Sequence, residues 1–378
     1  MRIVLLTRSF EIGGAETQIV ALAKGLQQGG HSVTMACFYA VGPLLQETID
    51  AGIPVMKLEK KGRWDIFGFV ARLGTRIAQE RPEIVQSYLG PPNILVALAN
   101  KNLDGAKIVW GIRASNMNLR NYDWSWRVAT WLERALAGRA RHIVSNSHAG
   151  IEQAMKQGLP TEKISVIANG IDIERFKPDP TAGIEVRQEW GLPIEAPLIG
   201  IVARFDPMKD HEMFLRAAAR LSERRPEARY VCIGDGPEDY VKHIKSQATA
   251  FGLGDKIIWP GARRDMPAIY NALDVLALTS SYGEGFPNTL GEAMACGTPC
   301  AATAVGDAEM IIGNCGMVVT KGDDDAMAKA WDQLLKETNV ECADRRTNCR
   351  NRVADTFSVA AMINSYTDLY RQLLQGTD

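Results

Sequence analysis

The sequence lacks the features that mark several classes of protein. Its seven cysteines are odd in number and scattered, without the close pairs that are typical of zinc sites and redox motifs. Hydrophobic residues make up 46% and charged residues 23% of the 378 residues, which excludes a disordered chain, a collagen-like chain or a disulfide scaffold. These absences predict a soluble globular protein with reduced thiols.

The first residues of the sequence show no pattern that is typical of an export signal or a membrane anchor. The apolar run in residues 1–7 is far shorter than the roughly 20 residues that span a bilayer, and no small-residue cleavage site follows it. We therefore expect a cytoplasmic protein. A length of 378 residues predicts two domains, each large enough to bury its own core.

A net charge of −1 hides an asymmetry between the two halves. Residues up to Pro180 carry a net charge of +6, whereas the remainder carries −7. A basic half can attract an anionic membrane, a phosphorylated acceptor or nucleic acid, and the count alone does not distinguish them. The halves are therefore expected to face different partners.

Short apolar strands alternate with amphipathic helices in both halves. Strands are expected over residues 2–7, 31–38, 53–58, 83–88, 107–112 and 142–147, and again over 198–205, 230–236, 256–261, 275–280, 298–305 and 317–320. This alternation predicts an α/β protein with two Rossmann-like, doubly wound parallel sheets. We place the domains at 1–182 and 183–360, because Pro and Asp are frequent in 169–186, and expect a terminal helix in 361–378 to pack back on the first domain.

The segment EGFPNTLGEAMACGTP, residues 284–299, predicts an anion site. A strand that ends at Ser280 leads into a glycine-containing loop and a helix from about Thr289, so that backbone amides and the helix dipole would meet a phosphate. Glu284 and Glu292 lie eight residues apart and could each accept hydrogen bonds from vicinal hydroxyls. The alternative is a solvated loop residue and a charge on a helix face.

Two further segments place functional groups after predicted strands. Arg204 and Lys209 leave the first strand of the second domain five residues apart, where two cations would neutralise a diphosphate. Gly13 and Gly14 follow the first strand of the chain, where an open α/β sheet approaches its ligands. The alternatives are an ordinary solvated pair of cations and a tight strand-to-helix turn.

Together these segments resemble a known family. The pattern E-x7-E at Glu284 and Glu292 is similar to the signature of retaining glycosyltransferases with the GT-B fold, particularly glycosyltransferase family 4, the group 1 glycosyltransferases. Five more segments match the family in the same order: IGGAETQ, VIANGIDIERFKP, VARFDPMKD, IGDGPE and GARRDMPAIYNALDVLALTSSYGEGFP. Because these matches are collinear, the resemblance covers most of the chain.

The resemblance implies two domains that face each other across a cleft, with the donor on the second and the acceptor mostly on the first. It implies roles near the reacting centre for Glu284, Arg204, Lys209 and Arg113. It implies no metal or other cofactor. The implied donor contacts are Gly14, Arg204, Lys209, Arg263, Glu284, Gly285, Phe286, Pro287, Asn288, Thr289, Leu290 and Glu292.

One position departs from the family. In VWGIRASN, Arg113 stands roughly where family members commonly carry a His. Arginine can hold a hydroxyl or an acceptor phosphate, but it is not deprotonated in proteins and cannot act as a general base. The way in which the acceptor hydroxyl is activated is therefore open.

The segment 118–142 concentrates tryptophan and arginine. Such a helix could lie on a membrane surface, with aromatic residues at the interface and cations toward lipid phosphates. The alternative is an ordinary helix that packs its tryptophans into the core, and the sequence slightly favours it.

The expected function is transfer of a sugar, with retention of configuration, from a nucleotide diphosphate donor to an acceptor hydroxyl. The resemblance implies a UDP-sugar and a lipid-linked saccharide of a bacterial surface polymer, on the cytoplasmic face of the inner membrane, with no nucleic acid partner. Alternatives are a nucleotide-sugar epimerase of the same fold and a nucleotide-sugar-binding protein without catalysis. The basic, aromatic-rich first half disfavours the epimerase, which would need no acceptor site.

Overall fold

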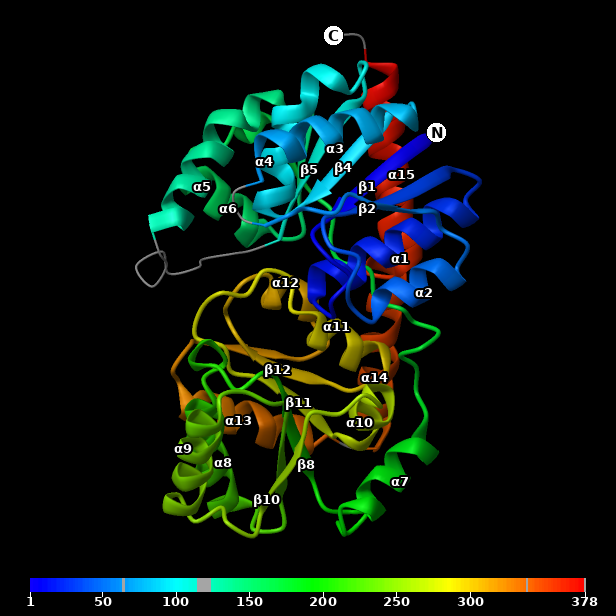
Figure 1. Ribbon diagram of the computed structural model, residues 1–378. Helices are drawn as coiled ribbons and strands as arrows, with labels where there is room; N and C mark the ends of the chain where they lie inside the picture. The colour runs from blue at the N-terminus through cyan, green and yellow to red at the C-terminus, as the bar shows by residue number, and fades with distance from the viewer. Residues whose placement is uncertain (63–64, 114–123, 338, 377–378) are drawn as a thin grey trace. The chain divides into compact units, whose positions relative to one another are not determined.

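The computed structural model describes residues 1–62, 65–113, 124–337 and 339–376. The chain forms two compact units (Figure 1). The first unit comprises Met1–Gly170 together with the chain from Val359 onward, and the second comprises Ile171–Ser358. Each unit has the parallel α/β architecture that the sequence predicts.

The first unit is built on a seven-stranded parallel sheet in the order β3-β2-β1-β4-β5-β6-β7. The strands are β1 (Arg2–Thr7), β2 (Ser32–Cys37), β3 (Val55–Lys57), β4 (Ile84–Tyr88), β5 (Lys107–Ile112), β6 (His142–Ser145) and β7 (Ile164–Val166). Six of them were expected from the sequence. The edge strand β7 was missed, because its three residues are only partly buried and give no clear hydrophobic pattern.

Helices cover both faces of this sheet. They are α1 (Gly14–Gln28), α2 (Leu44–Asp50), α3 (Phe67–Gln79), α4 (Gly90–Ala99), α5 (Trp124–Leu136), α6 (His148–Lys156) and α15 (Val359–Gln375). The strand β1 shows why two layers are needed: Ile3 and Leu5 are buried in one hydrophobic cluster, and Val4 and Leu6 in another. A strand whose consecutive residues are all apolar has an apolar side chain on each face and must be covered on both sides.

The second unit has a six-stranded parallel sheet in the order β10-β9-β8-β11-β12-β13. Its strands are β8 (Leu198–Val202), β9 (Arg229–Ile233), β10 (Ile257–Gly261), β11 (Val275–Leu278), β12 (Cys300–Thr303) and β13 (Met317–Val319). Its helices are α7 (Pro180–Glu189), α8 (His211–Arg224), α9 (Glu238–Ala250), α10 (Met266–Ala272), α11 (Asn288–Ala295), α12 (Ala308–Ile312), α13 (Asp324–Leu335) and α14 (Asn339–Thr356). Five of these six strands lie within the predicted ranges, and β9 begins one residue earlier, at Arg229.

The boundary between the units lies at Gly170, rather than after residue 182 as the composition suggested. Helix α7 and the segment before it pack on α10 of the second unit. The amide of Asp179 donates to Asn271 Oδ1 at 2.7 Å, and a Cβ atom on Gly183 would lie 2.4 Å from the carbonyl oxygen of Asn271. The Pro- and Asp-rich stretch is therefore largely part of the second unit.

The last helix, α15, belongs to the first unit and begins at Val359, two residues before the expected segment. It lies beside α1 (Figure 1). Tyr366 and Tyr370 are fully buried, and their hydroxyl groups bond to Tyr88 and Gln86 of β4. The first unit therefore needs the end of the chain to complete its core.

Candidate active site

The strand order of each sheet reverses direction at one point. In the first unit this point lies between β1 and β4, and in the second unit between β8 and β11. In open α/β sheets, ligands bind beside the carboxyl ends of the strands at such a switch point. In the second unit, the loops that leave β8 and β11 carry Arg204, Lys209 and Glu284, so the predicted residues converge where the fold favours a ligand.

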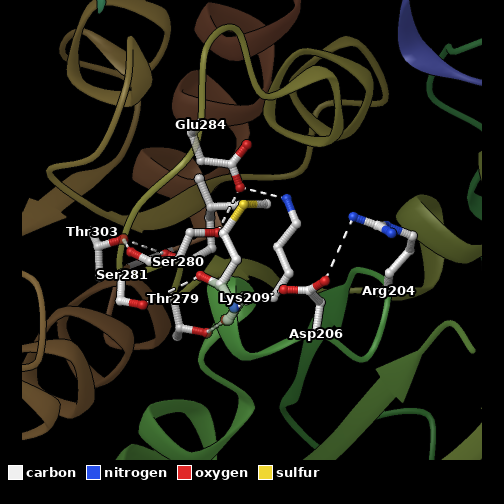
Figure 2. Close-up of polar contacts among 10 residues, drawn as sticks. Arg204, Asp206, Lys209, Thr279, Ser280, Ser281, Glu284 and Thr303 are labelled. Carbon is white, nitrogen blue, oxygen red and sulfur yellow. Dashed lines mark hydrogen bonds and ion pairs between the residues drawn. The ribbon is translucent and has the colours of Figure 1, made fainter. Parts of the chain in front are cut away.

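A buried ion pair joins these two loops (Figure 2). Lys209 Nζ lies 2.5 Å from Glu284 Oε1, and the same carboxylate oxygen accepts a hydrogen bond from Ser280 Oγ at 2.6 Å. The side chains of Lys209 and Glu284 are only 18% and 8% exposed. A charge-assisted contact at such low exposure is strong, and removal of either partner would leave a buried charge.

The loop after β8 is shaped by two aspartates. Asp206 Oδ1 accepts from the Met208 amide at 2.9 Å, and Asp210 Oδ1 accepts from the Met213 amide at 3.0 Å at the start of α8. Asp210 has a φ angle of 47°, in the left-handed region that Asp tolerates better than most residues. These caps fix the turn from which Lys209 points inward.

The loop after β11 is tied to the loop after β8 by backbone contacts. The Ser281 amide donates to the Met208 carbonyl at 2.9 Å, and Thr279 Oγ1 donates to the Lys209 carbonyl at 2.9 Å. A third loop supports the site through Gly306, which has a φ angle of 61°. A Cβ atom there would lie 2.6 Å from the Glu284 carbonyl oxygen, so the close approach requires glycine.

Helix α11 begins directly after the loop that follows β11, and no side chain caps its N-terminus. Its N-cap residue is Pro287, which provides no side-chain hydrogen bond. The partial positive charge of a helix N-terminus then favours an anionic ligand. Asn288 and Thr289 form the first positions of the helix, so their backbone amides lie at its positive end, where an anion would be favoured.

Two predicted donor contacts in this segment turn their side chains inward. Phe286 is buried and its ring packs against Phe357 with the centroids 5.4 Å apart. Leu290 is fully buried, and its carbonyl accepts a weak hydrogen bond from Cys300 Sγ. Their side chains hold the loop and the helix in place, so only their backbone groups could meet a ligand.

Arg204 presents the most accessible positive charge of the site. Its side chain is 72% exposed, and its Nη2 atom lies 3.8 Å from Asp206 Oδ2. The exposed, weak contact leaves the guanidinium able to move onto an arriving anion. Lys209 and Arg204 therefore offer one fixed and one adaptable cation.

Glu292 lies on α11, four residues into the helix. Its Oε2 atom accepts a hydrogen bond from Tyr270 Oη at 2.8 Å. Burial raises the pKa of the carboxyl group, and the contacts with Tyr270 and Arg175 act in the opposite direction. The hydrogen bond from Tyr270 therefore fixes the orientation of the Glu292 carboxyl group.

Arg263 does not present its guanidinium to the site. The side chain donates to both oxygens of Glu189, at 2.5 and 2.9 Å, and to both oxygens of Asp265, at 2.9 and 2.6 Å. These hydrogen bonds raise the pKa of Arg263. A ligand near this residue would meet its backbone.

Gly14 and Arg113 belong to the first unit and lie at the carboxyl edge of its sheet. Gly14 is the first residue of α1, after β1, and Arg113 follows β5. Gln18, the last residue of the IGGAETQ segment, lies on α1, and its side-chain amide exchanges two hydrogen bonds with the Gly170 backbone, at 2.9 and 2.7 Å. That contact is architectural.

Sequence reasoning missed the small polar residues that support the site. Ser280 binds Glu284, and Thr303 Oγ1 donates to the Ser280 carbonyl at 2.6 Å from the neighbouring strand. Both are fully buried. A short polar residue at the end of a predicted buried strand was the available signal, but serine and threonine are common there.

His211, the first residue of α8, is fully buried and stacks on Phe205 with the rings 4.3 Å apart. Neither ring nitrogen has a hydrogen-bond partner among the described residues. Burial, followed by the nearby charge of Lys209, lowers the pKa of His211 from 6.5 to about 4. The imidazole is therefore neutral at physiological pH.

We expect this histidine to make the second unit sensitive to acid. Its pKa is lower in the folded than in the unfolded chain, so its contribution is complete above pH 6.5 and is lost as the pH falls toward 4. The loss amounts to about 3 kcal/mol. Urea denaturation of wild type and His211→Leu at pH 7 and pH 4.5 should show a smaller acid-induced loss in the variant. The exposed-histidine variant His243→Leu should behave as wild type; an equal loss in all three proteins would contradict the assignment.

The described residues include no helix that is long and apolar enough to cross a membrane. Nor do they include a group of three or more His, Cys, Asp or Glu side chains arranged to hold a metal ion.

Solved structures define the class of the fold. Anabaena HepE, solved in complex with UDP, matches with a TM-score of 0.86 and 22% identity, over 98% of this chain and 100% of that chain. A glycosyltransferase from Rickettsia africae matches with a TM-score of 0.83 and 19% identity, over 100% and 99% of the two chains. The protein has the GT-B fold of glycosyltransferases.

Family models give the membership. The model of the glycosyl transferases group 1 matches residues 196–337, and the model of glycosyltransferase family 4 matches residues 12–175. Between them they match most of the chain. The chain belongs to this family of glycosyltransferases, as its motifs predicted.

Curated relatives share lower similarity over part of their length. The UDP-Gal:alpha-D-GlcNAc-diphosphoundecaprenol alpha-1,3-galactosyltransferase of Escherichia coli is 27% identical over 64% of this chain and 63% of its own length. A D-inositol 3-phosphate glycosyltransferase of Corynebacterium urealyticum is 31% identical over 56% of this chain and 52% of its own length. The matches thus span between about half and just under two thirds of these relatives.

Proposed function

We propose that the protein transfers a sugar from a nucleotide diphosphate sugar, with UDP as the nucleotide, to an acceptor hydroxyl. The observation that carries the proposal is the convergence of Lys209, Arg204 and the N-terminus of α11 at the switch point of the second sheet. These groups place two cations and the positive end of a helix dipole on the loops at this switch point. A diphosphate is the ligand that such a site favours.

The proposed chemistry depends on the charge that develops on the leaving group. The acceptor oxygen forms a bond to the anomeric carbon while the bond from that carbon to the phosphate oxygen breaks, and the hydroxyl proton passes to the released diphosphate. Arg204 and Lys209 stabilise the growing negative charge, which is the role that a divalent metal plays in other enzymes. We propose that no metal is required.

Glu284 is proposed to orient the transferred sugar, and Glu292 the ribose of the nucleotide. Glu284 Oε1 is already bound by Lys209 and Ser280, so its carboxylate is held in one orientation. Glu292 is oriented in the same way by Tyr270. A fixed carboxylate can accept two hydrogen bonds from vicinal hydroxyls without a large loss of side-chain entropy.

The donor site should therefore bind UDP without a metal. We expect UDP to raise the melting temperature of the wild-type protein equally with and without EDTA, and by more than GDP or ADP do. Arg204→Ala and Lys209→Ala should each reduce the rise, measured against the melting temperature of the same variant without ligand. At a UDP concentration 100 times Kd the rise corresponds to about 2.7 kcal/mol.

The control for this test is Lys242→Ala, which removes an exposed lysine of the same unit that pairs with Glu238. It should keep the full response to UDP. If no nucleotide raises the melting temperature, or if Arg204→Ala and Lys209→Ala respond as Lys242→Ala does, the donor site is wrong. A rise that disappears with EDTA would reject the metal-independent mechanism alone.

The acceptor is proposed to be a lipid-linked saccharide, bound by the first unit on the cytoplasmic face of a membrane. Two observations support this: the basic charge of the first half, and the relative from Escherichia coli, whose name specifies a diphosphoundecaprenol-linked sugar. The alternative of an epimerase would need no acceptor.

The reaction itself separates these alternatives. With UDP-glucose or UDP-galactose as donor and a short polyprenyl diphosphate-linked sugar as acceptor, we expect a glycosylated lipid whose new linkage has the anomeric configuration of the donor. Proton NMR coupling constants of the product report that configuration. An inverted product would reject the retaining mechanism, and conversion of the donor sugar without any transfer would instead identify an epimerase.

A membrane surface is proposed on helix α5. Trp131 and Val128, three residues apart on the same helix face, are 65% and 45% exposed. The expectation that the tryptophans pack in the core is therefore wrong for Trp131, whereas the side chains of Trp124 and Trp126 lie outside the described residues. Arg134, one turn further along the helix, is also exposed. An exposed aromatic beside a cation suits the interface of an anionic membrane.

We expect the protein to sediment with vesicles of phosphatidylglycerol more than with vesicles of phosphatidylcholine. Trp131→Ala should weaken this binding several-fold, because it removes apolar area from the interface. Phe67→Ala, which removes a 92% exposed aromatic from α3 of the same unit, is the matched control. Equal binding to both lipids, or a loss confined to Phe67→Ala, would reject the α5 surface.

A further inference from the structure

Arg113 is held in the first unit by neutral groups. Its Nη1 atom donates to Asn169 Oδ1 at 2.5 Å, and its Nη2 atom donates to Tyr366 Oη at 2.9 Å. The guanidinium also lies 4.6 Å from the centre of the Tyr88 ring. These partners come from the segment after β7, from α15 and from the end of β4, so three separate elements fix the side chain.

The positive charge of Arg113 has no carboxylate partner among the described residues. Burial raises the pKa of Tyr88 well above its ordinary value, so this phenol is neutral and supplies no countercharge. The Nε atom of Arg113 is buried without a hydrogen-bond partner in the described part of the chain. In the second unit, by contrast, the buried Arg187 lies 2.8 Å from Asp274.

An uncompensated, half-buried guanidinium is costly to maintain. A charge removed from water normally requires an opposite charge or a full set of hydrogen bonds. The partners of Arg113 orient the guanidinium but leave its charge in place. Such an arrangement is expected of a residue that receives its counter-ion from a ligand, with the orientation fixed in advance.

We propose that Arg113 binds an oxyanion of the acceptor, either a phosphate group or a carboxylate, and thereby makes the enzyme selective for acidic acceptors. The inference rests on the proposed function, because it places the acceptor on the first unit. A guanidinium is suited to either group, since its planar fork donates two parallel hydrogen bonds to two oxygens.

The position of Arg113 in the sheet supports a ligand-binding role. Arg113 directly follows β5, and Tyr88 is the last residue of β4, the strand at the switch point. Since the guanidinium lies over the Tyr88 ring, the charge is held beside the carboxyl end of β4. Ligands of open α/β sheets bind at this place.

The competing explanation is that Arg113 only links β5, α15 and the segment after β7. Removal of the arginine would then lower the stability of the first unit without any effect on anion binding. The two explanations differ in one measurable quantity, the affinity of the first unit for a small anion. The proposed diphosphate site of the second unit must be disabled before this affinity is measured.

The test therefore uses an Arg204→Ala, Lys209→Ala double variant as background, in which the diphosphate site of the second unit is disabled. Inorganic pyrophosphate and glucuronate are titrated by calorimetry at constant ionic strength. We expect at least one of them to bind, and Arg113→Gln to weaken that binding tenfold or more. Arg76→Gln, which removes an exposed arginine of the same unit, should leave the affinity unchanged.

The two probes identify the source of the oxyanion. Binding of pyrophosphate indicates a phosphorylated or lipid diphosphate acceptor, and binding of glucuronate indicates an acidic sugar. If Arg113→Gln does not fold, Arg113→Lys decides, because it keeps the charge but lacks the planar fork and should bind several-fold more weakly.

The proposal is overturned if neither probe binds, or if the Arg113 variants bind as tightly as the background protein. Failure of the proposed function is seen separately, as a lack of UDP binding by the wild-type protein, whose Arg204 and Lys209 are intact. The two results are independent because they report on different units.

Discussion

The buried contact between Lys209 and Glu284 is the interaction on which the candidate site depends. It joins the loops after β8 and β11, which are 75 residues apart in the sequence, at the point where the strand order reverses. Ser280 completes the contact, and Gly306 permits the backbone approach that closes the site. A lysine held in this way is a fixed positive charge in a region of low exposure, where electrostatic interactions are stronger than in water.

The two units share a sheet topology but differ in the charged groups at its switch point. Both sheets have a switch point at their carboxyl edge, yet the second unit surrounds it with paired charges and a helix N-terminus, whereas the first unit holds a cation among neutral groups. The paired charges and the helix N-terminus of the second unit suit a diphosphate whose negative charge grows during the reaction. The cation of the first unit suits a substrate that brings its own negative charge. The two units would thus bind the donor and the acceptor separately.

Much of the fold could be predicted because long buried strands produce continuous apolar runs, but residues with weak patterns could not. Strand β7 has three partly buried residues, and the boundary at Gly170 depends on how α7 packs on Asn271, which composition does not encode. The motif near Glu284 predicted a loop that meets the loop after β8 at the switch point of the second sheet. It could not show that Phe286 faces the core, or that Arg263 is bound by two carboxylates, because a motif does not distinguish side-chain from backbone roles.

The central claim, that the diphosphate of a nucleotide binds between the loops after β8 and β11, is tested most directly by a crystal structure of the protein with UDP. The account predicts density for the two phosphates within hydrogen-bond distance of Arg204, Lys209 and the first amides of α11, with a ribose hydroxyl at Glu292. UDP bound elsewhere in the second unit, or a diphosphate that contacts neither Arg204 nor Lys209, would contradict it.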